Sequence, residues 1–132
     1  MKKLSDLDFH NAEITFGEET PMYGDRQSRL EVIVDGKVMD VADVNFIVEP
    51  HIVHGQTLYQ THIFIADELQ HKGLGYNIYK TFVHEFGNIY SSHWCRKNNK
   101  EIISIFKRLA TEPDITVEKT SEYYLAYLKN QK

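Results

Sequence analysis

Two glycines stand two residues apart within residues 68–82, ELQHKGLGYNIYKTF, between a strand-like run and a helix-like run. Glycine allows a sharp turn and lets a ligand approach the backbone closely. A turn that leads into a helix presents unpaired N–H groups and the positive end of the helix dipole, and both attract anions. The spacing Gln70-x-x-Gly73-x-Gly75 therefore predicts a phosphate-binding site. The dinucleotide fingerprint, which needs a third glycine, and the Walker A loop do not match this stretch.

Histidine and cysteine are the other residue types in this chain that suit chemistry. His62 and His93 are candidates for a general base, because imidazole exchanges protons readily near neutral pH. His51 and His54 lie near His62, but no cysteine or acidic residue stands at metal-ligand spacing from them, so we expect no metal site. Cys95 is the single cysteine, which excludes an intramolecular disulfide and indicates a reducing compartment.

Length and composition predict one globular domain over residues 1–132, with 42% hydrophobic and 26% charged residues. The sequence lacks the run of about 18–20 apolar residues that a membrane-spanning helix needs. Acidic residues interrupt the N-terminal segment before an apolar stretch forms, so we expect no signal peptide. These features predict a cytoplasmic protein that does not enter a membrane.

Charge is distributed unevenly along the chain. Residues 1–68 carry 5 Lys/Arg against 13 Asp/Glu, net −8, and residues 69–132 carry 10 against 6, net +4. The acidic half argues against broad binding of a nucleic-acid backbone, which requires a basic face. The basic half begins at the turn that contains the two glycines, residues 70–75, which we name the glycine turn. Its charge suits a small anionic ligand there. Two solvated surfaces would also explain the same distribution.

Hydrophobic patterning predicts strands before the glycine turn. Residues 9–16 form a first short strand, and residues 17–28, which are rich in Gly, Pro and charge, form a loop. Residues 56–66 form a long strand whose apolar end indicates burial on both faces. Between them, Asp35-Gly36 joins two apolar runs and predicts a hairpin, because both turn residues need a positive φ. Pro50 is expected to end the second of these runs.

After the glycine turn, Leu74, Ile78, Phe82 and Phe86 recur at a spacing of four, which is the apolar stripe of an amphipathic helix. Gly87 is expected to end this helix. The remaining predicted elements are a strand over residues 88–94, a helix over residues 98–110 with Asn98 or Asn99 as its cap and Ile102, Ile103, Phe106 and Leu109 inward, and strands over residues 115–119 and 123–128. This order predicts an α/β fold with a mixed sheet.

At Gln70, Gly73 and Gly75 the chain resembles the GNAT superfamily of N-acetyltransferases, whose pyrophosphate-binding signature is Q/R-x-x-G-x-G/A at a strand-to-helix junction. The lead-in IADELQHKGLG is also similar to the family's V-x-P-E-x-R-G-K-G-I-G. The resemblance covers roughly residues 56–110 and marks the chain as a short, divergent member. It implies an α/β, GNAT-like, mixed and mostly antiparallel sheet flanked by helices, with reduced N-terminal helices.

The resemblance implies acetyl-CoA (coenzyme A) as the cofactor and an amine as the acyl acceptor. The pyrophosphate would lie on the N–H groups of the glycine turn, and Lys72 would add a positive charge. The pantetheine arm would pair like an extra strand with the backbone of Phe64 and Ile65. The implied cofactor-binding residues are Phe64, Ile65, Gln70, His71, Lys72, Gly73, Leu74, Gly75, Tyr76, Asn99 and Phe106.

The sequence departs from the family pattern at the catalytic positions. When the family's N-x-x-A-x-x-x-Y-x-K helix is aligned on Asn99, Phe106 replaces the tyrosine that often protonates the departing thiolate. No carboxylate lies at residues 56–66, where some members carry a glutamate, so His62, His93 or a water relay would act as the base. The short segment 17–28 stands where the family usually has helices beside the acceptor.

Two functions of different classes follow from these residues. The first is an acyl-CoA-dependent N-acyltransferase that transfers an acetyl group to a primary amine on a polyamine-like small molecule or on a protein. The acidic first half favours a cationic acceptor. The second is a GNAT-fold binding module that has lost catalysis. The tyrosines Tyr123, Tyr124 and Tyr127 are typical of core or of a homodimer surface.

Overall fold

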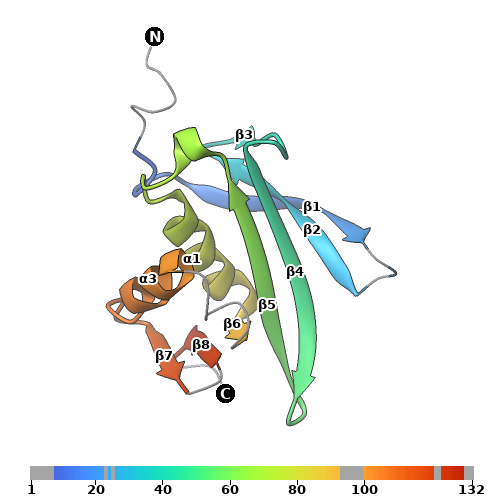
Figure 1. The fold of residues 1–132 in the computed structure, drawn as a ribbon, viewed down its shortest axis with the longest axis vertical. Coiled ribbons are helices and arrows are strands. Elements are labelled where there is room, and N and C mark those ends of the chain that lie inside the picture. The colour runs from blue at the N-terminus through green and yellow to red at the C-terminus, as the bar shows by residue number, and fades with distance from the viewer. Residues whose placement is uncertain (1–7, 23, 25, 93–99, 121–122, 130–132) are drawn as a thin grey trace. The chain divides into compact units, whose positions relative to one another are not determined.

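The computed structural model describes residues 8–22, 24, 26–92, 100–120 and 123–129. Figure 1 labels the elements along the chain. The strands are β1 (Ile14–Met22), β2 (Gln27–Val34), β3 (Lys37–Val38), β4 (Val44–Val53), β5 (Gln56–Ile65), β6 (Asn88–Ser92), β7 (Ile115–Lys119) and β8 (Tyr123–Leu128). The helices are the 3-10 turn η2 (Asp67–Leu69), α1 (Leu74–Phe86) and α3 (Lys100–Leu109).

The strands pair in the order β1-β2-β4-β5-β6-β8-β7, with β3 beside β2. The pairs β1–β2, β2–β3, β2–β4, β6–β8 and β7–β8 are antiparallel. The pair β5–β6 is parallel, with Gln60 opposite Tyr90. The prediction of an α/β fold with a mixed, mostly antiparallel sheet is therefore confirmed.

Contacts group the chain into two compact units. The first unit comprises residues 1–49 and 62–78, and the second comprises residues 50–61 and 79–132. β4, β5 and α1 each contribute residues to both units.

In the first unit the core lies on one face of the strands. Every second residue of β2 is buried, at Leu30, Val32 and Val34, as the two-residue period of a half-buried strand requires. Phe46 of β4 is fully buried and stacks on Phe16 of β1, with ring centroids 5.7 Å apart. The alternation seen in the sequence of β2 thus determines which face packs inward.

The predicted strand over residues 9–16 and the predicted loop over residues 17–28 have the wrong bounds. β1 begins only at Ile14 and continues to Met22, so that most of the expected loop is a hairpin strand. Thr20 and Pro21 pair with Arg29 and Ser28 of β2, and a bulge between Phe16 and Glu19 absorbs the irregular register. Because β1 is an edge strand, its proline withdraws no hydrogen bond from the interior of the sheet.

The hairpin turn at Asp35-Gly36 is confirmed, because both residues have positive φ, 50° and 82°. The apolar run after this turn is not the single strand that was predicted. It divides into the short β3 and the long β4, and β4 continues past Pro50 to Val53. A second turn of the same kind, His54-Gly55 with φ of 51° and 77°, joins β4 to β5.

Both predicted helices are confirmed. The stripe of α1 buries Leu74, Ile78 and Phe82, and Phe86 at its end is half-buried. Gly87 follows with a φ of 97°, a conformation that favours glycine at the end of a helix. Within the described ranges, no helix is long and apolar enough to cross a membrane.

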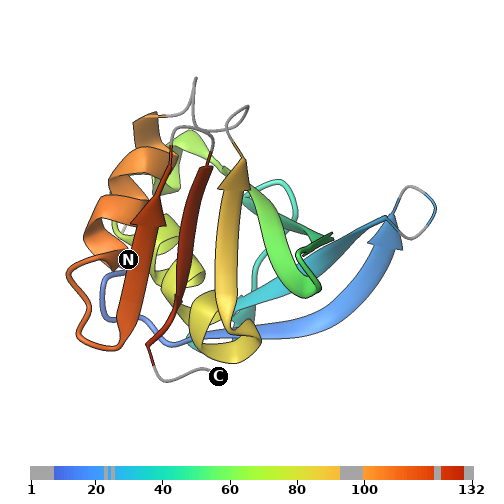
Figure 2. The same cartoon turned by 90° about the horizontal axis from the view of Figure 1, so that it is seen from below.

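In the second unit α1 and α3 lie on one face of β6, β8 and β7 (Figure 2). Phe106 of α3 is fully buried, stacks on Tyr124 of β8 at 5.4 Å and meets the edge of Tyr79 of α1 at 6.4 Å. Tyr124 is buried, which confirms a core position for that tyrosine. The predicted caps Asn98 and Asn99 lie outside the described residues.

Candidate functional site

The glycine turn, residues 70–75, leads from the end of β5 into α1. β5 ends at Ile65, η2 makes one tight turn, and α1 begins at Leu74. The side-chain amide of Gln70 donates hydrogen bonds to the carbonyl of Ile65 at 2.8 Å and to Oδ1 of Asp67 at 3.3 Å. Gln70 therefore ties the turn back to the strand that precedes it.

The backbone of the glycine turn contains two left-handed residues. His71 has a φ of 63° and Gly73 a φ of 86°. A non-glycine residue in this region is uncommon and costs about 1–2 kcal/mol. Lys72, between them, is half-buried. Of the two glycines that predicted a sharp turn, Gly73 is left-handed, whereas Gly75 lies inside α1 and has no positive φ; the other left-handed position is taken by His71.

The start of α1 has the charge that an anion-binding site needs. Its first intrahelical hydrogen bond runs from the N–H of Asn77 to the carbonyl of Gly73 at 3.0 Å. The N–H groups of Leu74 and Gly75 precede this first bond, in the part of a helix where N–H groups face outward from its N-terminus. No acidic side chain stands in the first turn of α1, so the positive end of the helix dipole is not neutralised there.

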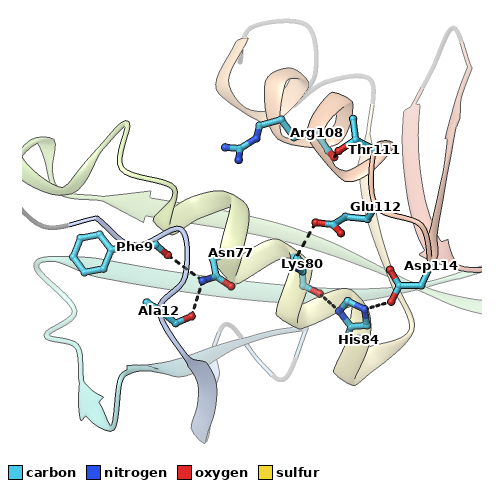
Figure 3. A network of polar contacts seen from close by, with 9 residues as sticks. All are labelled: Phe9, Ala12, Asn77, Lys80, His84, Arg108, Thr111, Glu112 and Asp114. Atoms are coloured by element: carbon cyan, nitrogen blue, oxygen red, sulfur yellow. Dashed lines mark hydrogen bonds and ion pairs between the residues drawn. The ribbon is translucent and has the colours of Figure 1, made fainter.

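A short N-terminal segment, residues 8–12, lies against this turn, and we name it the strap. The N–H of Phe9 donates to the carbonyl of Lys72 at 2.9 Å. The side-chain amide of Asn77 donates to the carbonyls of Phe9 at 3.0 Å and Ala12 at 2.7 Å (Figure 3). Phe9 is itself buried. Three hydrogen bonds and one buried ring therefore fasten the strap to the turn and to α1.

His10, in the middle of the strap, packs directly on Gly73. A side-chain carbon built on Gly73 would lie 2.5 Å from Cδ2, 2.6 Å from Cγ and 2.7 Å from Nε2 of His10. Real side-chain carbons do not approach other atoms so closely. Gly73 is therefore required both by its positive φ and by the imidazole ring that rests on it.

Asp8 holds the ring of His10 in this place. Its Oδ1 accepts a hydrogen bond from the N–H of His10 at 2.9 Å and lies 2.5 Å from Nδ1 of the same ring. The backbone hydrogen bond and then the side-chain hydrogen bond from His10 lower the pKa of Asp8, and the charge of Lys72 adds to this effect. The strap thus brings a carboxylate into the field of Lys72.

The other predicted site residues are placed as follows. Phe64 is 55% exposed, so the prediction that the end of its strand is buried on both faces is wrong. Ile65 and His62 are half-buried on β5.

The predicted cofactor-binding residues at and after the turn differ in exposure. Leu74 is buried in the core, whereas Gly75 and Tyr76 are half-buried at the start of α1 and His71 is exposed. Phe106 belongs to the second unit, and His93 and Asn99 lie outside the described residues.

Sequence reasoning missed Asp8, His10 and Asn77. Asn77 carried a usable signal, because asparagine is unfavourable inside a helix unless its side chain bonds to backbone groups. Asp8 and His10 carried none, because His10 contacts Gly73, which lies more than 60 positions later in the chain, and Asp8 bonds to His10.

A second polar cluster joins α1 to the loop between α3 and β7 in the second unit (Figure 3). Nε2 of His84 lies 2.5 Å from Oδ2 of Asp114, and Nδ1 lies 2.9 Å from the carbonyl of Lys80. The ammonium of Lys80 pairs with Glu112 at 3.3 Å. Because both ring nitrogens of His84 already face acceptors, this cluster fastens α1 and offers no open base.

Asp114 should make folding stability depend on acidic pH. The hydrogen bond from His84 lowers the pKa of Asp114 below its ordinary 3.8, so its stabilisation is present above that value and is lost as the pH falls through the folded-state pKa. Because Asp114 is 52% exposed, the effect should be only about 0.5 kcal/mol. Denaturant titrations should show Asp114→Asn less stable than the wild type at pH ~5, with the difference narrowing at a second pH below 3.8.

Glu85→Gln is the matched control for that titration, since Glu85 is an exposed carboxylate next to His84 on the same helix. Its stability should follow that of the wild type at both pH values. A difference between wild type and Asp114→Asn that persists unchanged at low pH would contradict the assigned role of the carboxylate.

Comparisons with models of known protein families and with curated proteins find no match to this chain. Within the described residues, no three or more His, Cys, Asp and Glu side chains are grouped so as to hold a metal ion. A function has to be inferred from the chemistry of the glycine turn.

Proposed function

We propose that the chain is an acyl-CoA-dependent N-acyltransferase and that the glycine turn binds the pyrophosphate of coenzyme A. The observation that carries the proposal is the junction of β5 and α1, where the residues of the Q-x-x-G-x-G pattern form a turn with two left-handed positions directly before a helix. Such a junction favours a phosphate group through its N–H groups and its dipole.

The charges at the turn suit a pyrophosphate. Lys72 supplies a point charge, the start of α1 supplies N–H groups, and no acidic residue of the first helical turn opposes them. The bound group would bring a thioester, which supplies an activated acyl group. The residues of this chain would hold its phosphates at the turn and its arm along β5 near Phe64, which is 55% exposed.

The path of the chain around the turn gives further support. β5, α1 and the parallel strand β6 form a crossover unit, strand–helix–strand. In units of this kind anionic ligands bind at the carboxyl end of the first strand, beside the N-terminus of the helix. The glycine turn occupies that position.

A primary amine is proposed as the acyl acceptor, and a cationic one is preferred, because residues 1–68 carry a net charge of −8. His62 on β5 remains the proposed base among the described residues, since a protonated amine cannot attack a thioester. An assay of thiol release from acetyl-CoA over a panel of cationic and anionic amines tests both statements. Turnover only with anionic acceptors would contradict the charge argument.

A binding module without catalysis is the second candidate, and one observation favours it. Phe106, which stands where the resemblance implies a proton donor, is fully buried against Tyr79 and Tyr124 and carries no titratable group. Calorimetric binding of coenzyme A without thiol release from any amine would select this alternative. The absence of any coenzyme A binding would reject both candidates.

Lys72→Glu should weaken coenzyme A binding about tenfold or more, because the reversed charge would stand beside the pyrophosphate. Isothermal titration calorimetry measures the affinity directly. Lys37→Glu is the matched control, since Lys37 is an exposed lysine of β3 and the net charge changes equally. Equal affinities for the two variants would place the phosphates away from the glycine turn.

A further inference from the structure

The strap contacts the glycine turn through a side chain and a main-chain hydrogen bond. The ring of His10 rests on Gly73, at the point where a side-chain carbon of that residue would stand. The backbone N–H of Phe9 donates a hydrogen bond to the carbonyl of Lys72. A ligand that needs close approach to the backbone at Gly73 therefore meets an imidazole ring first.

The strap also presents the wrong charge to an anionic ligand. Asp8 is ionised at neutral pH, because the backbone and side-chain hydrogen bonds from His10 lower its pKa, and the charge of Lys72 adds to this effect. A carboxylate within the field of the turn's lysine competes with an incoming phosphate and repels it. Asp8 thus adds a negative charge near the lysine of the turn.

We propose that the strap is an autoinhibitory contact that must lift before a phosphate group can reach the glycine turn, with Asn77 as its latch. This inference rests on the proposed function, because it names the regulation of the same site. Asn77 is suited to the role, since one side-chain amide bonds to the carbonyls of both Phe9 and Ala12. Loss of that amide removes two of the three hydrogen bonds described between the strap and the rest of the unit.

The strap can be released in three independent ways in the full chain. Asn77→Ala removes the latch, His10→Ala removes the ring on Gly73, and Asp8→Asn removes the competing charge. Each should raise the affinity for coenzyme A by about threefold or more, because the binding-competent state becomes more populated. Isothermal titration calorimetry with coenzyme A measures this change, and circular dichroism checks that each variant is folded.

Asn11→Ala is the matched control, since Asn11 is an exposed residue of the same strap. It should bind coenzyme A as the wild type does. In hydrogen exchange without ligand, the N–H of Phe9, which bonds to Lys72, should exchange about tenfold faster in Asn77→Ala than in Asn11→Ala.

The outcomes distinguish a failure of the strap's proposed role from a failure of the proposed function. Coenzyme A binding that is equal or weaker in all three release variants would overturn the strap while leaving the proposed function standing. An unchanged exchange rate of the Phe9 amide in Asn77→Ala would contradict the role of Asn77 as the latch of the strap. Binding by neither the wild type nor any release variant would overturn the proposed function and the strap's regulatory role together.

Discussion

Gly73→Ala is expected to lower the free energy of unfolding by about 2–4 kcal/mol, the largest loss from any single methyl group added to the turn. Two terms contribute. The φ of 86° is strained for any residue with a side chain, and the new carbon would lie 2.5–2.7 Å from three atoms of His10. Chemical denaturation measures the loss, and an unchanged slope of the transition shows that stability alone has changed.

Gly36→Ala separates the two terms. Gly36 has nearly the same φ, 82°, but nothing lies within 4 Å of the position that its side chain would take. It should therefore lose only the backbone term, about 1–2 kcal/mol. If Gly73→Ala and Gly36→Ala were equally destabilised, His10 would not be packed on the turn. Because Gly73 supports the fold in this way, Lys72 is the cleaner position at which to test ligand binding.

Phe106→Tyr is expected to lower the free energy of unfolding by about 1–3 kcal/mol and to leave any transferase activity without gain. Phe106 is fully buried between Tyr79 and Tyr124. A hydroxyl added there would be removed from water and would have to find a new partner inside a packed aromatic cluster. Thermal and denaturant unfolding measure the loss, and thiol release from acetyl-CoA measures activity.

Phe86→Tyr is the matched control, since Phe86 also lies in an aromatic cluster but is only half-buried, at the end of α1. Its stability should change by less than about 0.5 kcal/mol. A rise in turnover for Phe106→Tyr, with unchanged stability, would contradict the buried position and would support the proton-donor role that the resemblance implies for this place in the chain.

Local signals in the sequence were sufficient for several elements. Asp35-Gly36 predicted its turn because two successive positive φ angles leave few other residue types. The four-residue stripe from Leu74 and the stop at Gly87 predicted α1, since burial of one helical face and a left-handed end both leave a trace in residue order. The same holds for the two short strands at the end of the chain.

Two strand boundaries depend on pairing between strands, which local sequence signals do not show. The segment Gly17–Met22 has the composition of a loop, yet hydrogen bonds to β2 hold it as an edge strand. Pro50 ends no strand, because β4 continues through it to Val53. β-propensity depends on the neighbouring strand more than on the residue itself, so these two boundaries were misplaced.

The candidate site divides in the same way. Residue types and their spacing were enough to predict a sharp turn with Gly73 before an amphipathic helix, because φ sign and apolar period are properties of neighbouring residues. The hydrogen bonds from Asn77 to Phe9 and Ala12, 68 and 65 positions away, and the contact of His10 with Gly73 are tertiary contacts that residue order does not reveal. Such contacts follow from how the chain folds back on itself, and they leave no periodic pattern in the residues that make them.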